Sequence, residues 1–173
     1  MLGSSDDFTR EMFMKAMAAI GSAAFVGVLL TIGLGLGSFF LLIEPSVFVD
    51  WFWLYFWFFL GPVWLTSIPA FIGSIAMLRR STQGSGQRRL WKISLGGLIA
   101  TYAITAVVHL PLNITFWFLD LSDTQITTNL YIWMAFHFLR VATAFIAAIY
   151  TYRAVIGHFT PDRPTNQSYG ATS

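Results

Sequence analysis

The sequence predicts an all-α integral membrane protein, a bundle of four transmembrane helices. Of the 173 residues, 56% are hydrophobic and only 10% are charged, whereas a soluble domain carries about 25% charged residues. Four apolar runs also follow one another, each near or above the roughly 20 residues that a helix needs to cross a bilayer. Because backbone hydrogen bonds must be satisfied internally in lipid, we expect these runs to be helices and not strands.

The predicted membrane domain takes up residues 1–157, and residues 158–173 form a polar tail with two prolines that we expect to be a loose end. The start of the chain carries acidic residues before its basic ones and no clear cleavage site, so we do not expect a secretory signal. The helix boundaries follow the apolar runs. The four helices are expected at about residues 18–43, 51–78, 93–119 and 130–155.

The distribution of charged residues predicts the orientation of the bundle. The connection between the second and third helices holds no acid and five basic residues: Arg79, Arg80, Arg88, Arg89 and Lys92. The other two connections hold no Lys or Arg but contain acids: Glu44, Asp50, Asp120 and Asp123. Cytoplasmic loops carry the excess of Lys and Arg. We therefore expect the middle loop and both termini on the cytoplasmic side of a membrane, the inner membrane of a bacterium.

Small residues in the first helix predict close helix packing. The run GSAAFVGVLLTIGLGLGS places Gly21, Gly27, Gly33 and Gly37 along this helix. Such residues let neighbouring backbones approach each other in membrane bundles. A phosphate-binding glycine loop is not expected inside a run that faces lipid.

Four polar side chains stand out inside the third and fourth apolar runs: His109, Asn113, His137 and Arg140. Ionisable groups at membrane depth are costly and rare, and they mark functional sites. The spacing of four residues in the third helix and three in the fourth puts each pair on one helix face. At a rise of about 1.5 Å per residue, both pairs fall at a similar depth in the outer half of the membrane. We expect the two polar stripes to face each other across one site.

Aromatic residues extend both stripes outward. Trp117 follows Asn113 by four residues, and Trp133 precedes His137 by four. The expected pocket is polar at the bottom and aromatic toward the outer surface. This shape suits a flat, mostly apolar molecule with one or two oxygens.

Arg140 needs a counter-charge or a ligand oxygen at this depth, because intramembrane charges commonly pair with one another. Glu44, at the outer end of the first helix, is the preferred partner, and a purely structural Arg140–Glu44 clamp is an alternative to a binding site. Two histidines with Glu44 would also suit non-haem iron, and histidines on facing helices can ligate haem. Arg140 lies one turn from His137 and would repel a cation, so no metal is expected.

Composition excludes other classes of site. The chain has no cysteine, which removes disulfides, thiolate catalysis and Cys-ligated zinc or iron–sulfur clusters. No basic run with interleaved aromatics indicates nucleic-acid binding.

The segments HLPLN at 109–113 and FHFLR at 136–140 resemble the paired signatures of the anthrone oxygenase-like four-helix membrane proteins. That family shows His-x-Pro-x-Asn on the third helix and, after a Trp, His-x-x-Arg on the fourth. The matching residues here are His109, Pro111, Asn113, Trp133, His137 and Arg140. The family often has a second asparagine after the first, where this chain has Ile114. The resemblance implies oxygenation of polyketide anthrones to anthraquinones without an evident metal or organic cofactor.

The leading hypothesis is a cofactor-independent membrane monooxygenase, an oxidoreductase that acts on a hydrophobic phenolic, anthrone- or quinol-like aromatic. Such a substrate loses a proton and its electron-rich anion reacts with O₂. His109 or His137, kept neutral by burial, would be the base. Arg140 would hold the developing enolate oxygen.

The remaining candidates are assigned to substrate binding. Asn113 would orient a second oxygen, Trp117 and Trp133 would stack on the rings, and Glu44 would belong to the same binding site.

The alternative is a non-catalytic accessory subunit of a larger membrane complex that binds a quinone, pigment or lipid. His109 or His137 would then ligate a chlorophyll or haem. The expected partners are membrane lipids, a small hydrophobic aromatic ligand, and either other membrane proteins or further copies of the chain. A transporter ranks third, because the four helices show no detectable inverted repeat.

Overall fold

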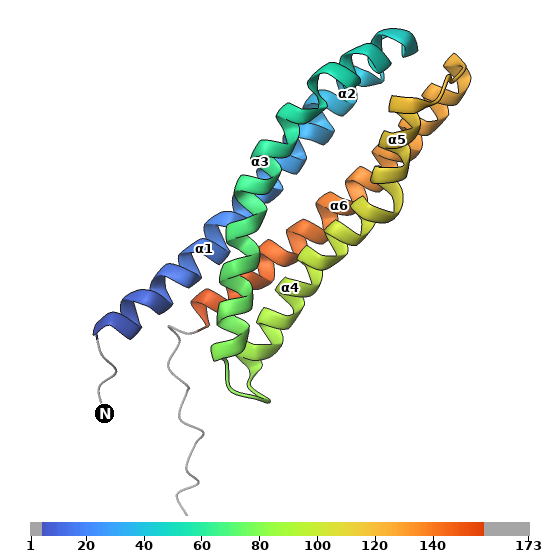
Figure 1. Ribbon diagram of the computed structural model, residues 1–173. Coiled ribbons are helices and arrows are strands. Elements are labelled where there is room, and N and C mark those ends of the chain that lie inside the picture. The colour runs from blue at the N-terminus through green and yellow to red at the C-terminus, as the bar shows by residue number, and fades with distance from the viewer. Residues whose placement is uncertain (1–4, 158–173) are drawn as a thin grey trace, which may run out of the picture.

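The computed structural model describes residues 5–157, which form long helices joined by short connections (Figure 1). In chain order the elements are α1 Ser5–Leu30, the π-helix η1 Thr31–Gly37, α2 Ser38–Phe40, α3 Pro45–Arg80, α4 Gly86–Ile104, the π-helix η2 Thr105–His109, α5 Leu110–Phe118 and α6 Asp123–Ile156. No strand occurs among these described residues. The predicted all-α class is confirmed.

The elements join into four continuous segments that are long and apolar enough to cross a membrane, with 36, 36, 33 and 34 residues in chain order. Four predicted helices are therefore confirmed, but each begins earlier than expected, at Ser5, Pro45, Gly86 and Asp123. Hydropathy marks the part of a helix that lies in lipid, whereas capping decides where the helix begins. Ser122 and Gln125, for example, form a capping box at the start of α6, ahead of the predicted residue 130.

The bundle consists of two antiparallel helix pairs. α1 lies beside α3, and α4 lies beside α6 (Figure 1). Contacts between α1 and α6 and between α3 and α4 join the pairs. The start of α1, the connection 81–85 and the end of α6 lie at one end of the molecule (Figure 1). The side of the membrane that this end faces stays a prediction, and the predicted tail 158–173 lies outside the described residues.

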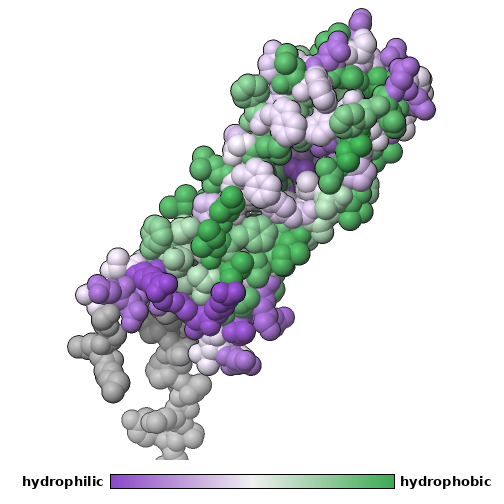
Figure 2. Space-filling view, in the orientation of Figure 1, coloured by the Kyte–Doolittle hydropathy of each residue, from purple (hydrophilic) through white to green (hydrophobic). Residues whose placement is uncertain are grey.

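An apolar surface covers the middle of the molecule on the face shown in Figure 2, between hydrophilic ends. Large apolar side chains are exposed over the length of the segments, among them Ile20, Phe58, Leu65 and Val107. Exposed apolar surface on this scale marks contact with another apolar phase or partner. With the four long segments, it indicates a membrane protein.

Close approach of helices depends on single glycines. A Cβ atom at Gly21 would lie 2.6 Å from the backbone nitrogen of Ala70 on α3. A Cβ at Gly97 of α4 would lie 2.8 Å from the carbonyl oxygen of Thr143 on α6. The predicted packing role is confirmed for Gly21, and also for Gly33 and Gly37, which lie against side chains of α6. It is wrong for Gly27, which has open space where its Cβ would be.

Two of the four segments contain a turn of π-helix, η1 and η2. In η2 the cause is Pro111, which has no N–H and whose ring conflicts with the carbonyl four residues earlier. The helix widens just before it, and the Leu110 N–H bonds to the Thr105 carbonyl, five residues back. Such wide turns are rare in proteins, and those that occur are often found at functional sites. Both lie next to the polar residues described below.

Candidate functional site

The polar residues of the third and fourth segments meet inside the bundle. The ring centroids of His109 and His137 are 6.0 Å apart, and both side chains are fully buried. The two predicted stripes therefore lie at the same level. They approach from η2 and α5 on one side and from α6 on the other.

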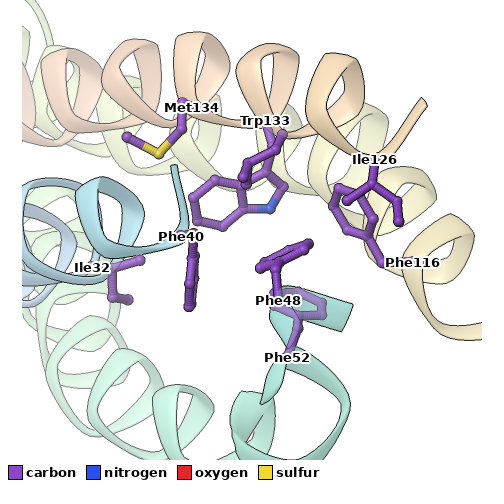
Figure 3. Packing of buried hydrophobic residues seen from close by; sticks show 9 residues of the cluster. Ile32, Phe40, Phe48, Phe52, Phe116, Ile126, Trp133 and Met134 are labelled. Atoms are coloured by element: carbon purple, nitrogen blue, oxygen red, sulfur yellow. The ribbon is translucent and has the colours of Figure 1, made fainter. Parts of the chain in front are cut away.

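Trp133 lies at the centre of this cluster. Its ring stacks on His137 with a centroid distance of 5.1 Å and an interplanar angle of 9°, and it meets His109 at 5.1 Å in an edge arrangement. The indole N–H donates a hydrogen bond to Oδ1 of Asn113 at 3.0 Å. Figure 3 shows Trp133 extending from α6 toward Phe40, with Phe48 and Phe52 of α3 on the opposite side. A tryptophan thus joins three of the four polar candidates and an aromatic wall.

The imidazole of His137 is held from both sides. Its Nε2 lies 2.8 Å from the carbonyl oxygen of Leu29, and because a carbonyl only accepts, Nε2 carries the proton. A Cβ at Gly33 would lie 2.9 Å from the same nitrogen, so the ring fits only against a glycine. Nδ1 has no hydrogen-bond partner among the described residues. His137 is therefore tied to the backbone of the first segment.

His109 is buried without such a tie. Neither ring nitrogen makes a hydrogen bond within residues 5–157. Backbone carbonyls of Ile104 and Trp133 lie near the ring but outside hydrogen-bond geometry. Buried polar groups are nearly always paired, so this exception calls for an explanation.

Arg140 likewise has no partner among the residues that the structure describes. No carboxylate of residues 5–157 forms an ion pair with it, its side chain makes no hydrogen bond, and its Nε is buried. The predicted pair with Glu44 is wrong, because Glu44 is exposed at the start of α3. The alternative of a purely structural Arg140–Glu44 clamp is wrong for the same reason.

A cavity of about 130 Å³ lies in front of Arg140. Most of its wall is aliphatic or aromatic, with Phe25, Phe40, Phe56, Phe59 and Trp64 among the lining residues. Its polar lining residues are Tyr102, Thr105, Asn113, Trp133 and Arg140. Figure 2 shows a hollow with a hydrophilic floor in the half of the molecule that holds α2 and α5.

Two polar lining residues were missed by the sequence analysis, Tyr102 and Thr105 on the third segment. Together with His109 and Asn113 they follow a spacing of three, four and four residues, which is the period of one helix face. Their hydroxyl groups already have partners: Tyr102 bonds to Ser67 at 2.5 Å, and Thr105 donates to the Thr101 carbonyl at 2.9 Å. Extending the polar stripe inward along the helix would have found both.

Four predicted site residues do not line the cavity: His109, His137, Trp117 and Glu44. The two histidines lie against Trp133. Trp117 packs on aromatic side chains of α3, stacked on Trp57 at 5.7 Å and edge-on to Phe56 at 4.7 Å. The cavity therefore presents Asn113, Trp133 and Arg140 of the predicted set.

The geometry also bears on metals and pigments. Within residues 5–157, no group of three or more His, Cys, Asp or Glu side chains is placed to hold a metal ion. Nε2 of His137 is engaged by Leu29, and neither imidazole lines the cavity. This arrangement does not fit axial ligation of a haem or chlorophyll.

The arrangement offers donors without acceptors to match. The Arg140 guanidinium and the Asn113 amide NH₂ make no hydrogen bond to the described protein. Such donors suit a ligand with oxygen acceptors, and an anionic oxygen suits Arg140 best. Comparisons with models of known protein families, with curated proteins and with solved structures find no match for this chain.

Proposed function

We propose that this protein binds a hydrophobic phenol- or anthrone-like aromatic in its intramembrane cavity and oxygenates it with O₂. The observation that supports the proposal best is the unpaired Arg140 at the wall of an otherwise apolar cavity. An unpaired cation at membrane depth is costly, so it is expected to have a functional partner. The resemblance of HLPLN and FHFLR to the anthrone oxygenase-like signatures supports the reaction type.

Binding would use the two free donors of the cavity. The Arg140 guanidinium holds the phenolate or enolate oxygen, and the Asn113 NH₂ meets a second oxygen. Asn113 is oriented for this role because its Oδ1 already accepts from Trp133. The indole of Trp133 lines the cavity and offers a face for the ring of the ligand.

The reaction needs a phenol or anthranol with hydrogen on the carbon para to its hydroxyl. The hydroxyl proton leaves, and the anion passes one electron to O₂. The resulting radical and superoxide combine at the para carbon to a peroxide anion, which takes up the released proton and becomes a hydroperoxide. Loss of water from the hydroperoxide makes the second carbonyl, so one oxygen atom enters the quinone and the other becomes water. Stabilising the anion beside Arg140 lowers the barrier to the first step.

Two routes are available to the phenol proton. Of the two proposed bases, His109 has both nitrogens unpaired but lies behind Trp133. Catalysis by His109 therefore requires the Trp133 ring to turn, whereas a sufficiently acidic phenol ionises beside Arg140 without a histidine.

This position of the histidines favours a second candidate function, a non-catalytic subunit that holds a quinone or lipid. Under this function the Trp133–His137 stack and the His137–Leu29 bond are structural. In either case we place the protein in the cytoplasmic membrane of a bacterium, in contact with lipid and with further membrane proteins or copies of itself.

The experiment uses the full chain in lipid nanodiscs with two probes, a dihydroxyanthrone and a naphthol with an open para position. Oxygenation predicts quinone formation above the rate in empty nanodiscs, with one atom of isotope-labelled O₂ in the quinone. Arg140→Met is expected to lose binding and turnover, and a loss of turnover alone in His109→Gln would assign the proton acceptor to His109. Arg140-dependent binding without turnover would establish the second candidate, and the absence of binding would exclude both.

A further inference from the structure

A second hollow lies on the outer face of the α1–α3 pair. Its volume is about 380 Å³, and its wall includes Gly27 and Thr31 of the first segment and Pro62 of α3. Gly27 has open space where a side chain would extend. This hollow and a second one, which adjoins it at Ala24, are together called the α1–α3 groove.

The groove continues along the helix pair. Ala24 belongs both to this hollow and to another of about 310 Å³ that reaches Phe13 and Leu65. From Phe13 to Leu36 the first segment advances about 35 Å at 1.5 Å per residue, slightly more than the hydrocarbon thickness of a bilayer. The groove therefore runs over most of the length of the helix pair.

The groove offers no free polar group. The hydroxyl of Thr31 donates to the Gly27 carbonyl at 3.0 Å, and the hydroxyl of Thr66 donates to the Pro62 carbonyl at 2.8 Å. The remaining lining residues are apolar. The groove is suited to a hydrocarbon chain and to no polar ligand.

The groove and the cavity are neighbours. Ile32, Leu36 and Phe59 line both, so one layer of side chains separates them. Ile32 and Leu36 belong to η1, the widely wound part of the first segment. A ligand that extends between η1 and α3 reaches from one hollow into the other by displacing three apolar side chains.

The cavity is small compared with the pockets that hold whole ligands. Pockets for drug-sized molecules measure about 300–1,000 Å³, whereas this cavity measures about 130 Å³. It accommodates a small ring system with its oxygens, and the rest of a larger ligand must lie elsewhere.

We propose that the ligand is an aromatic with a long alkyl or prenyl chain, whose ring lies at Arg140 and whose chain passes between η1 and α3 into the α1–α3 groove. This inference rests on the proposed binding function and specifies its ligand class. The continuity of groove and cavity favours the ligand's own chain over a bulk lipid or a second copy of the protein.

The first test compares two probes, a naphthol without a chain and the same naphthol with a decyl chain, for binding to the full protein in nanodiscs. Gly27→Leu fills the groove and is expected to weaken binding of the decyl naphthol about tenfold, a change of about 1.4 kcal/mol. Binding of the chain-free naphthol should change less than about twofold. Gly96→Leu is the matched control, since Gly96 is an exposed glycine of α4 with open space around its Cβ, and both affinities should stay unchanged. Ratios to wild type cancel the partition of the decyl chain into lipid.

The second test locates the chain. A decyl naphthol with a terminal diazirine should label the hollow nearest the cavity, within the stretches 24–31 and 59–62, and Arg140→Met should abolish this labelling. Labelling that persists in Arg140→Met would show ordinary lipid contact and overturn the inference. Equal effects of Gly27→Leu on both naphthols, or a changed oligomeric state in that variant, would also overturn it. If wild type binds neither naphthol, the proposed function fails; if it binds the chain-free naphthol through Arg140 and the chain adds nothing, only the inference fails.

Discussion

The residues of the site differ in whether their buried polar atoms have hydrogen-bond partners. The Trp133 N–H and the His137 Nε2–H each have an acceptor, whereas Arg140 Nε and both nitrogens of His109 have none among the described residues. A buried polar group without a partner costs about 1–3 kcal/mol. The paired groups should therefore stabilise the fold. The unpaired groups should lower the stability of the empty protein and remain available to bind a ligand.

Arg140→Met is accordingly expected to stabilise the empty protein by about 1–3 kcal/mol, because it removes an unpaired charge from membrane depth. The measurement is reversible unfolding in detergent without added ligand. Arg140→Lys keeps a charge and serves as the control, with no comparable gain. A less stable Arg140→Met would show that the guanidinium has a structural partner.

Asn113→Leu is expected to destabilise the protein by about 1–3 kcal/mol, since the Trp133 N–H then has no acceptor. Trp133→Phe removes the donor, so the double variant should be less affected than the sum of the two single variants. A double-mutant cycle of unfolding free energies gives the coupling. Strictly additive effects would contradict the importance of the hydrogen bond seen at 3.0 Å.

The sequence predicted the meeting of His109 with His137 correctly, because spacing and depth suffice to place residues on facing helices. It predicted only part of the cavity lining, namely Asn113, Trp133 and Arg140. Trp117 and Asn113 share a helix face, yet Trp117 packs on the aromatics of α3. The rotation of one helix against its neighbours depends on side-chain packing from another segment, which helical spacing alone does not contain.

At the scale of elements, the four spans could be predicted and the two π-helices could not. An α turn and a π turn of the same residues have the same hydropathy. The apolar composition of TIGLGLG in η1 and TAVVH in η2 therefore predicts a helix in lipid, but not which kind of helix. Pro111 is the one local signal, and it equally allows a simple kink. In η1 even this signal is absent, and Gly33 there lies against His137 of another segment, a contact that the local sequence does not contain.

The glycines of η1 provide a matched pair for testing this contact. Gly33→Ala would bring a Cβ within 2.9 Å of His137 Nε2 and should destabilise the protein by about 1–3 kcal/mol through strain and a weakened bond to Leu29. Gly35→Ala meets nothing within 4 Å and should stabilise the helix by about 0.5–1 kcal/mol. The measurement is the free energy of unfolding of both variants and of wild type in the same detergent. Similar effects at the two positions would show that η1 does not hold His137.

At the scale of the molecule, the connection 81–85, the start of α1 and the end of α6 share one end of the bundle, and the connection is flanked by the basic residues Arg79, Arg80, Arg88, Arg89 and Lys92. Positive charge at this end predicts that it faces the cytoplasm. The wild-type chain has no cysteine, so single cysteines report without background. Gln83→Cys and Thr124→Cys place a thiol at exposed positions of opposite ends.

We expect a membrane-impermeant maleimide to label Thr124→Cys in intact spheroplasts and Gln83→Cys only after permeabilisation. The reverse pattern would invert the predicted orientation. Labelling of both in intact spheroplasts would mean that the chain has no fixed orientation.

The two π-helices also have a consequence for ancestry. A π turn contains about one residue more than the α turn it replaces. A related chain that lacks this residue in η2 would keep four spans of nearly equal length and hydropathy. The α turn that replaces η2 would complete nearly the same rotation with one residue fewer, so Tyr102 and Asn113 would keep their positions around the cavity. Descendants of one ancestor can therefore differ by a single-residue gap inside a span and still share both the fold and its cavity.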